Sequence, residues 1–96
     1  MIFAITGHFS PDAKPDAPAL QSELNEHLGQ ALIKVRLAGP LYNFDGKKTG
    51  FLVCLEADDF QSARAYLHES PYFKAGCYDR VEIAHFAVEV GAGQLR

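Results

Sequence analysis

The chain has 96 residues, of which 48% are apolar and 22% are charged, and its formal net charge is −3. This composition is that of an ordinary globular protein and excludes an intrinsically disordered chain. Acidic and basic residues are interspersed, and no basic run is longer than Lys47-Lys48, so the sequence predicts no nucleic-acid partner. A chain of this length forms one domain, which we assign to residues 1–96.

The apolar start and the two cysteines indicate the compartment. Residues 1–9 have no basic region before them, and Ser10-Pro11-Asp12 stops the apolar run well short of a membrane span. We therefore predict a cytoplasmic protein with no membrane partner. Cys54 lies in an apolar run and Cys77 lies beside a glycine, far apart in sequence. Two isolated, buried or half-buried thiols are expected, rather than a disulfide or a metal-ligand pair.

The first part of the chain is predicted to form a strand, a loop and a helix. Residues 1–9 alternate large and small apolar side chains without turn residues, which predicts a strand. Three prolines and two aspartates make residues 10–18 a loop. A helix is expected from about Ala17 to a fraying end at Gly29. Its apolar stripe consists of leucines four residues apart, Leu20, Leu24 and Leu28.

Two further strands are predicted next. Apolar and basic residues alternate over 33–37, which predicts a half-buried strand that Gly39-Pro40 ends or bends. Residues 42–50 are polar and are expected to form a loop. Residues 51–56 form a continuous apolar run, which predicts a second fully buried strand.

The last part of the chain is predicted to form a helix and a strand. Asp58 can cap a helix whose inward residues are Phe60, Ala63 and Leu67. Ser70-Pro71 ends that helix, because the residue before proline avoids helical backbone. A turn through Gly76 then leads to a strand over residues 81–90, and residues 91–96 are expected to form a flexible tail.

The resulting order, βαββαβ, is typical of an α+β fold, the ferredoxin-like plait with a four-stranded antiparallel sheet. In that plait the first and third strands are central, and here residues 2–5 and 51–55 are apolar on both faces. Two helices cover only one face of the sheet. We therefore predict a homodimer through the other sheet face, with an undetected extra element as the alternative.

Two short strings place turn residues beside polar side chains and predict a pocket: residues 37–41, Leu-Ala-Gly-Pro-Leu, and residues 70–76, Ser-Pro-Tyr-Phe-Lys-Ala-Gly. With residues 50–57 between them, they resemble the YciI-like (YCII-related) family of small dimeric α+β barrel proteins. The likeness spans residues 33–90. It implies a ferredoxin-like protomer, a dimer across the sheet face and one pocket per protomer.

The resemblance also implies positions for a catalytic pair. In that family a histidine near the start of the first helix and an aspartate just before the Pro-aromatic pair form a proposed acid/base dyad. The aspartate position is Ser70 here. When the chain is aligned with the family pattern from Ala38 toward the N-terminus without a gap, the histidine position falls at Ser22. The nearest histidine in that helix is His27. A serine hydroxyl supplies neither the charge nor the orientation that a carboxylate gives an imidazole.

The candidate catalytic residues are therefore His8, His27 and Ser70. His8 ends the first strand, where an imidazole can enter a pocket mouth, the alternative being a hydrogen bond to the proline loop. His27 lies one residue before Leu28 and faces either the sheet or solvent. Ser70 either binds a ligand or only ends the helix.

The candidate ligand-binding residues are Ser22, Gly39, Pro40 and Tyr72. Tyr72 and Phe73 point opposite ways, so one is expected in the core and the other on the cavity wall. Tyr72 suits the wall better because its hydroxyl can contact a polar ligand.

The other two histidines are expected to be structural. His68 is predicted to contact solvent and the negative end of its helix, and His85 to lie in the core or at the dimer interface. No histidine has a second ligand at metal-binding spacing, and no nucleophile has an activating motif, so the sequence indicates no metal and no cofactor.

Three functions remain open at this point. The first is a protein that binds a small aromatic or ring-containing metabolite and acts as a weak lyase or isomerase, with His8 or His27 as base and with Ser70 and Tyr72 orienting the ligand. The second is a non-catalytic sensor or carrier that keeps the pocket but has lost the dyad. The third is a cofactor-free monooxygenase-like relative.

Overall fold

The computed structural model describes residues 1–30 and 34–90. Its elements are β1 (Ile2–Phe9), α1 (Pro18–Leu28), β2 (Lys34–Tyr42), β3 (Lys48–Glu56), α2 (Phe60–His68), α3 (Pro71–Lys74) and β4 (Tyr78–His85). The strands form one antiparallel sheet in the order β2-β3-β1-β4. The predicted α+β ferredoxin-like plait, with the first and third strands central, is confirmed.

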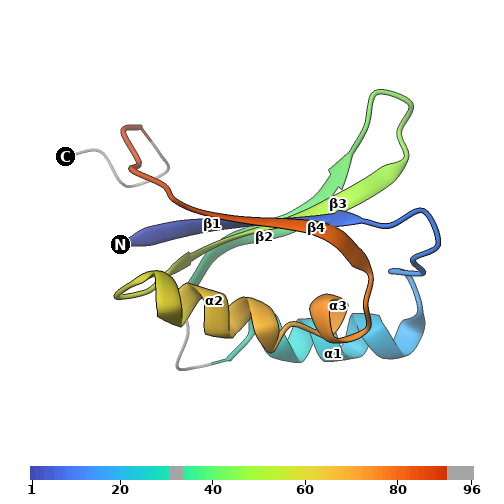
Figure 1. The fold of residues 1–96 in the computed structure, drawn as a ribbon, viewed down its shortest axis with the longest axis horizontal. Coiled ribbons are helices and arrows are strands. Elements are labelled where there is room, and N and C mark those ends of the chain that lie inside the picture. The colour runs from blue at the N-terminus through green and yellow to red at the C-terminus, as the bar shows by residue number, and fades with distance from the viewer. Residues whose placement is uncertain (31–33, 91–96) are drawn as a thin grey trace.

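The two faces of the sheet differ in what covers them. Successive strand residues point to opposite faces, so Phe3 and Ile5 of β1 and Leu55 of β3 face the helices and are buried in the core. All the helices lie on that one side (Figure 1). We call the other surface the open face. Its central part consists of mostly apolar residues paired across three strands, namely Ala4, Thr6, Leu52, Cys54 and Ala84.

Strand β2 contradicts the prediction that Gly39-Pro40 ends it. The strand continues through both residues to Tyr42, and the loop to β3 is accordingly shorter than predicted. Proline is tolerated there because β2 is an edge strand, whose outward amides need no partner. Its pairing with β3 is irregular at two places, between Val35 and Leu37 and between Leu41 and Tyr42. The predicted start of this strand at Ile33 lies outside the described residues.

Helix α2 begins one residue later than predicted. Its N-cap is Asp59 and not Asp58, and the Asp59 carboxylate accepts a hydrogen bond from the backbone N–H of Ser62 at 2.8 Å. Ala63 and Leu67 are buried as predicted, whereas Phe60 is 51% exposed. The helix ends before Pro71, and Pro71 then begins the short helix α3, which the sequence did not predict. Proline favours a first helical turn because its missing amide has no partner there.

Strand β4 was predicted over residues 81–90 and is shorter. It starts at Tyr78, just after the turn at Gly76, and ends at His85, opposite Phe3. One more hydrogen bond joins the backbone N–H of Phe86 to the carbonyl of Ile2, the first residue of β1. Strand β4 therefore ends where its antiparallel partner β1 begins and offers no further residues for pairing. The predicted tail over residues 91–96 lies outside the described residues.

The cysteine prediction is confirmed: Cys54 and Cys77 are both free and buried. Within residues 1–30 and 34–90, the structure contains no helix that is long and apolar enough to cross a membrane.

Candidate functional site

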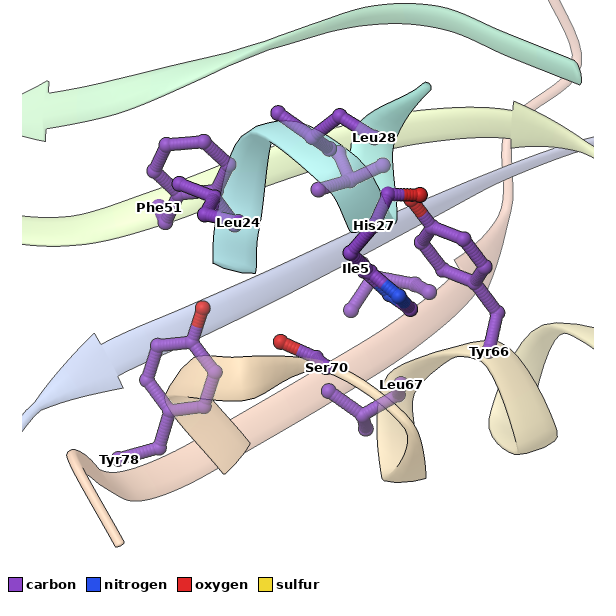
Figure 2. Close-up of a pocket in the computed structure, with 10 residues that line it drawn as sticks. Ile5, Leu24, His27, Leu28, Phe51, Tyr66, Leu67, Ser70 and Tyr78 are labelled. Atoms are coloured by element: carbon purple, nitrogen blue, oxygen red, sulfur yellow. The ribbon is translucent and has the colours of Figure 1, made fainter. Parts of the chain in front are cut away.

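A small cavity lies between α1, the end of α2 and the helix-covered face of the sheet (Figure 2). We call it the His27 cavity. Its lining is mostly apolar and comes from all of these elements: Ile5, Leu24, His27, Leu28, Phe51, Val53, Tyr66, Leu67, Ser70 and Tyr78. Its free volume is about 10 Å³. A volume of that size holds about one water molecule.

His27 is the most unusual residue of this lining. It lies one helical turn after Leu24 on the buried side of α1 and is only 6% exposed. Its ring stacks on Tyr66, with centroids 4.0 Å apart, and its Nδ1 lies 3.0 Å from Nε2 of Gln30. Its own Nε2 is buried and has no hydrogen-bond partner among the described residues. Buried polar atoms in folded proteins almost always have a partner, so this nitrogen is available to a ligand.

The partner of Nδ1 decides what the free nitrogen can do. If Gln30 donates its amide N–H to Nδ1, the ring proton is on Nε2, which then donates. If the amide is turned so that Gln30 accepts from Nδ1, Nε2 carries a lone pair and accepts. The two neutral tautomers of His27 are therefore a proton donor and a proton acceptor at the same point of the cavity.

Burial keeps this imidazole neutral. Desolvation lowers the pKa of His27 below its ordinary value of 6.5, against the opposing effects of the backbone near Tyr66 and of the Glu69 charge. The Tyr66 hydroxyl also donates a hydrogen bond to the backbone carbonyl of His27 at 3.1 Å, which fixes α1 against α2. Burial raises the pKa of Tyr66 to about 12, so its hydroxyl stays protonated. The cavity is thus uncharged at neutral pH.

This neutral histidine should make stability depend on pH. The unfolded chain takes up a proton at His27 near pH 6.5, whereas the folded protein does so only at lower pH. The unfolded state therefore binds more protons in acid, and the free energy of unfolding should fall as the pH drops below that value. In urea unfolding at a series of pH values, the free energy of unfolding should fall less steeply with decreasing pH for His27→Gln than for the wild type. An identical dependence on pH in the two proteins would contradict a neutral, buried His27.

Ser70 joins His27 in the lining although the two residues are far apart in sequence. It is buried at the junction of α2 and α3, where its backbone N–H donates to Leu67 and its carbonyl accepts from Lys74. Its side chain makes no capping hydrogen bond to α3. Figure 2 shows its hydroxyl on the cavity side, between Tyr78 and Leu67. Two of the three candidate catalytic residues therefore share one cavity.

His8, the third candidate, lies elsewhere. It is on the open face, where its Nε2 is 3.3 Å from Glu82 Oε1 and 3.1 Å from Arg80 Nη2. The sheet separates it from the His27 cavity. His8 therefore does not line the His27 cavity, because the alternation along β1 turns its side chain away from the helices.

The predicted ligand-binding residues also lie outside the cavity. Ser22 is exposed on α1, so the count without a gap does not lead to the pocket. Gly39 and Pro40 belong to the edge strand β2 and line no part of the cavity. Tyr72 is 1% exposed in the core, where its hydroxyl accepts a hydrogen bond from Gln21 Nε2 at 2.9 Å.

The aromatic wall comes from Tyr66 and Tyr78, which the sequence analysis missed. Tyr66 shares the buried side of α2 with Ala63 and Leu67, and this helical spacing could have indicated it. No local signal indicates Tyr78, whose place depends on where β4 begins. Of the remaining histidines, His68 is exposed and stacks on Phe73, and His85 lies beside Phe3 on the helix-covered face.

The fold is a ferredoxin-like plait that holds a buried imidazole between its helices and its sheet. A family model for the YCII-related domain matches residues 1–87, and the chain belongs to this family. None of the curated proteins matches the chain.

Solved structures that are similar to the chain include two that cover most of its length. One is the 5-chloro-2-hydroxyhydroquinone dehydrochlorinase TftG of Burkholderia phenoliruptrix AC1100, in complex with 2,5-dihydroxybenzoquinone. It has a TM-score of 0.67 and 19% identity, over 91% of this chain and 94% of that one. The other is Rv0793 of Mycobacterium tuberculosis, with a TM-score of 0.53 and 16% identity, over 95% of this chain and 100% of that one. At these identities the likeness shows the fold.

Proposed function

We propose that this protein binds a small ring-containing metabolite in the His27 cavity and that His27 moves a proton to or from it, as in a weak lyase or isomerase. One observation carries the proposal: the buried Nε2 of His27 lies in a mostly apolar cavity and has no hydrogen-bond partner in residues 1–30 or 34–90. Apolar walls suit a ring, and Ser70 with the two tyrosine hydroxyls offers a few polar contacts that can orient it. The ring compound held by the similar dehydrochlorinase structure supports this ligand class.

The site must widen to accept a ring. A free volume of about 10 Å³ is far below that of an aromatic molecule. Its walls are side chains of two helices and the sheet, and the sheet is the rigid part. We therefore expect α1 to move outward on binding, or His27 and Leu28 to change rotamer, so that the ligand replaces the stacking of His27 on Tyr66.

A non-catalytic sensor or carrier is the second candidate. The observation that favours it is that no carboxylate lines the cavity in the described part of the chain, where Ser70 stands at the position that holds an acid in the family dyad. Without a carboxylate partner, an imidazole is a weaker base and a less strictly oriented one.

Hydroquinone, which is uncharged at neutral pH, is a suitable first probe. The wild type should bind it and gain thermal stability, because a ligand of the native state raises the melting temperature. Loss of one hydrogen bond in His27→Ala should weaken binding by about tenfold. His68→Ala removes an exposed histidine outside the cavity and should bind like the wild type. Equal binding by all three proteins would contradict the site.

Turnover separates the enzyme from the carrier. The substrate of the similar dehydrochlorinase, 5-chloro-2-hydroxyhydroquinone, reports proton transfer through chloride release. The lyase proposal predicts chloride release by the wild type and its loss in His27→Gln. Binding of both ring compounds without chloride release above the uncatalysed rate would support the carrier.

We also propose that a second copy of the chain covers the open face. Ala4 and Leu52 are partly exposed on the two inner strands beside the buried Cys54, and Leu37 next to them is 58% exposed. Such a surface is costly in water, and a two-fold sheet-to-sheet contact would bury it.

Sedimentation at micromolar concentration should show a dimer for the wild type and a monomer for Ala4→Glu, which places a charge at the centre of the open face. Ala65→Glu makes the same change on the exposed side of α2 and should leave the dimer intact. A wild-type monomer under these conditions would contradict the proposed interface.

A further inference from the structure

A second hollow lies on the outer side of His27. It is an open groove between α1 and the α2–α3 junction, with a volume of about 430 Å³. Its lining consists of polar and charged side chains with one proline, namely Glu23, Glu26, His27, Gln30, Glu69, Pro71 and Lys74. His27 lines both this groove and the inner cavity, so the two hollows meet at this residue.

The two hollows differ in what they can hold. The inner cavity has room for about one water molecule, whereas the groove falls within the range of about 300–1,000 Å³ typical of small-molecule sites. His27 is the one residue that the two linings have in common. A ring compound that enters from the groove on its way to the buried Nε2 passes the charges of the groove.

The charge of the groove is negative. Three of its residues are glutamates and one is a lysine. Lys74 Nζ lies 3.3 Å from Glu69 Oε1, so these two charges offset each other. No salt bridge within the described part of the chain neutralises Glu23 or Glu26. An anion entering the groove meets two carboxylates that form no salt bridge with residues 1–30 or 34–90.

We propose that this groove is the entrance to the His27 cavity and that it selects an uncharged or cationic ring compound over an anionic one. The proposal rests on the proposed function and narrows its ligand class. The carboxylates of the groove repel an anionic ligand, whereas an uncharged phenol passes them. An uncharged ligand also suits the cavity, because a charge buried among mostly apolar walls is costly. A hydroxylated quinone is a vinylogous acid that ionises readily in water, so this chain should prefer a less acidic ring.

A matched pair of ligands tests this selection. Hydroquinone and 2,5-dihydroxybenzoate share two ring hydroxyls and differ by one carboxylate. Calorimetric titration of the wild type at low salt should show hydroquinone binding at least about fivefold more tightly. The double variant Glu23→Gln with Glu26→Gln should bind the benzoate about threefold to tenfold more tightly than the wild type does, with hydroquinone unchanged. Added salt should narrow the wild-type difference because it screens surface charges.

The control variant removes two charges elsewhere. Asp45 and Asp58 are exposed and do not line the groove, so Asp45→Asn with Asp58→Asn should leave both affinities unchanged. An equal gain in benzoate affinity in this control would assign the effect to net charge and overturn the proposal. Equal binding of the two ligands by the wild type would overturn the charge selection and leave the site in place. If neither ligand binds the wild type or any variant, both the proposed function and the proposed entrance are overturned.

Discussion

Phe3→Ala should lower the free energy of unfolding by about 3–5 kcal/mol. Phe3 is fully buried near the start of the central strand β1, and its ring packs edge-on against Phe60 with centroids 4.8 Å apart. It also contacts His85 across the sheet. Truncation removes the apolar contacts of a whole ring and leaves a cavity between the sheet and α2 that the rigid central strand cannot close. Urea unfolding monitored by circular dichroism measures the loss.

Phe44 offers the matched control for that change. It lies in the loop between β2 and β3 and is fully exposed. Phe44→Ala should therefore change the unfolding free energy by less than about 0.5 kcal/mol. A small effect at Phe3, comparable with that at Phe44, would mean that the helices do not pack on this face of the sheet as described.

Gly7→Ala should cost about 1–3 kcal/mol of stability and should also disturb the candidate site. A Cβ atom at Gly7 would overlap the ring of Tyr78, which packs directly over the glycine. Tyr78 lines the His27 cavity and stacks on Phe9, with ring centroids 5.5 Å apart. The methyl group must displace that ring, so the effect reaches the cavity wall. Unfolding and hydroquinone binding, measured on the same variant, report the two consequences.

Two comparisons make the Gly7 prediction specific. Gly39→Ala adds a methyl group where no atom lies within 4 Å and should be nearly neutral. Combining Gly7→Ala with Tyr78→Ala should cost less than the sum of the two single changes, since the overlapping ring is then absent. Strict additivity would show that Gly7 is required for some reason other than the ring above it.

The order of the strands could be predicted because of a local signal. Residues of β1 and β3 are apolar at both parities, which is typical of central strands, while β2 carries Lys34 and Arg36. The ends of the strands could not be predicted in the same way. Strand β4 stops where β1 runs out, and Pro40 is tolerated because β2 has no neighbour on one side. Both facts depend on pairing between segments that are distant in sequence.

The candidate site was predicted only in parts. His27 and Ser70 were singled out separately, one from its place beside the leucine stripe and the other from the family resemblance, but no local pattern brings them into one cavity. His8 lies on the side of β1 that carries Ala4, as the alternation of side chains along a strand requires. The sequence did not show that this side faces away from the helices, because the choice of face depends on how the helices pack.

The central claim, that the free nitrogen of His27 is where a ligand binds, can be tested most directly by NMR of the imidazole nitrogens on histidine-labelled protein during a hydroquinone titration. If the ligand binds at this nitrogen, the Nε2 signal of His27 should shift in a saturable way while the signals of His68 and His85, which lie outside the cavity, stay in place. His27→Gln identifies the signal by its loss. A saturable shift confined to another histidine, with the His27 signal unmoved, would contradict the account.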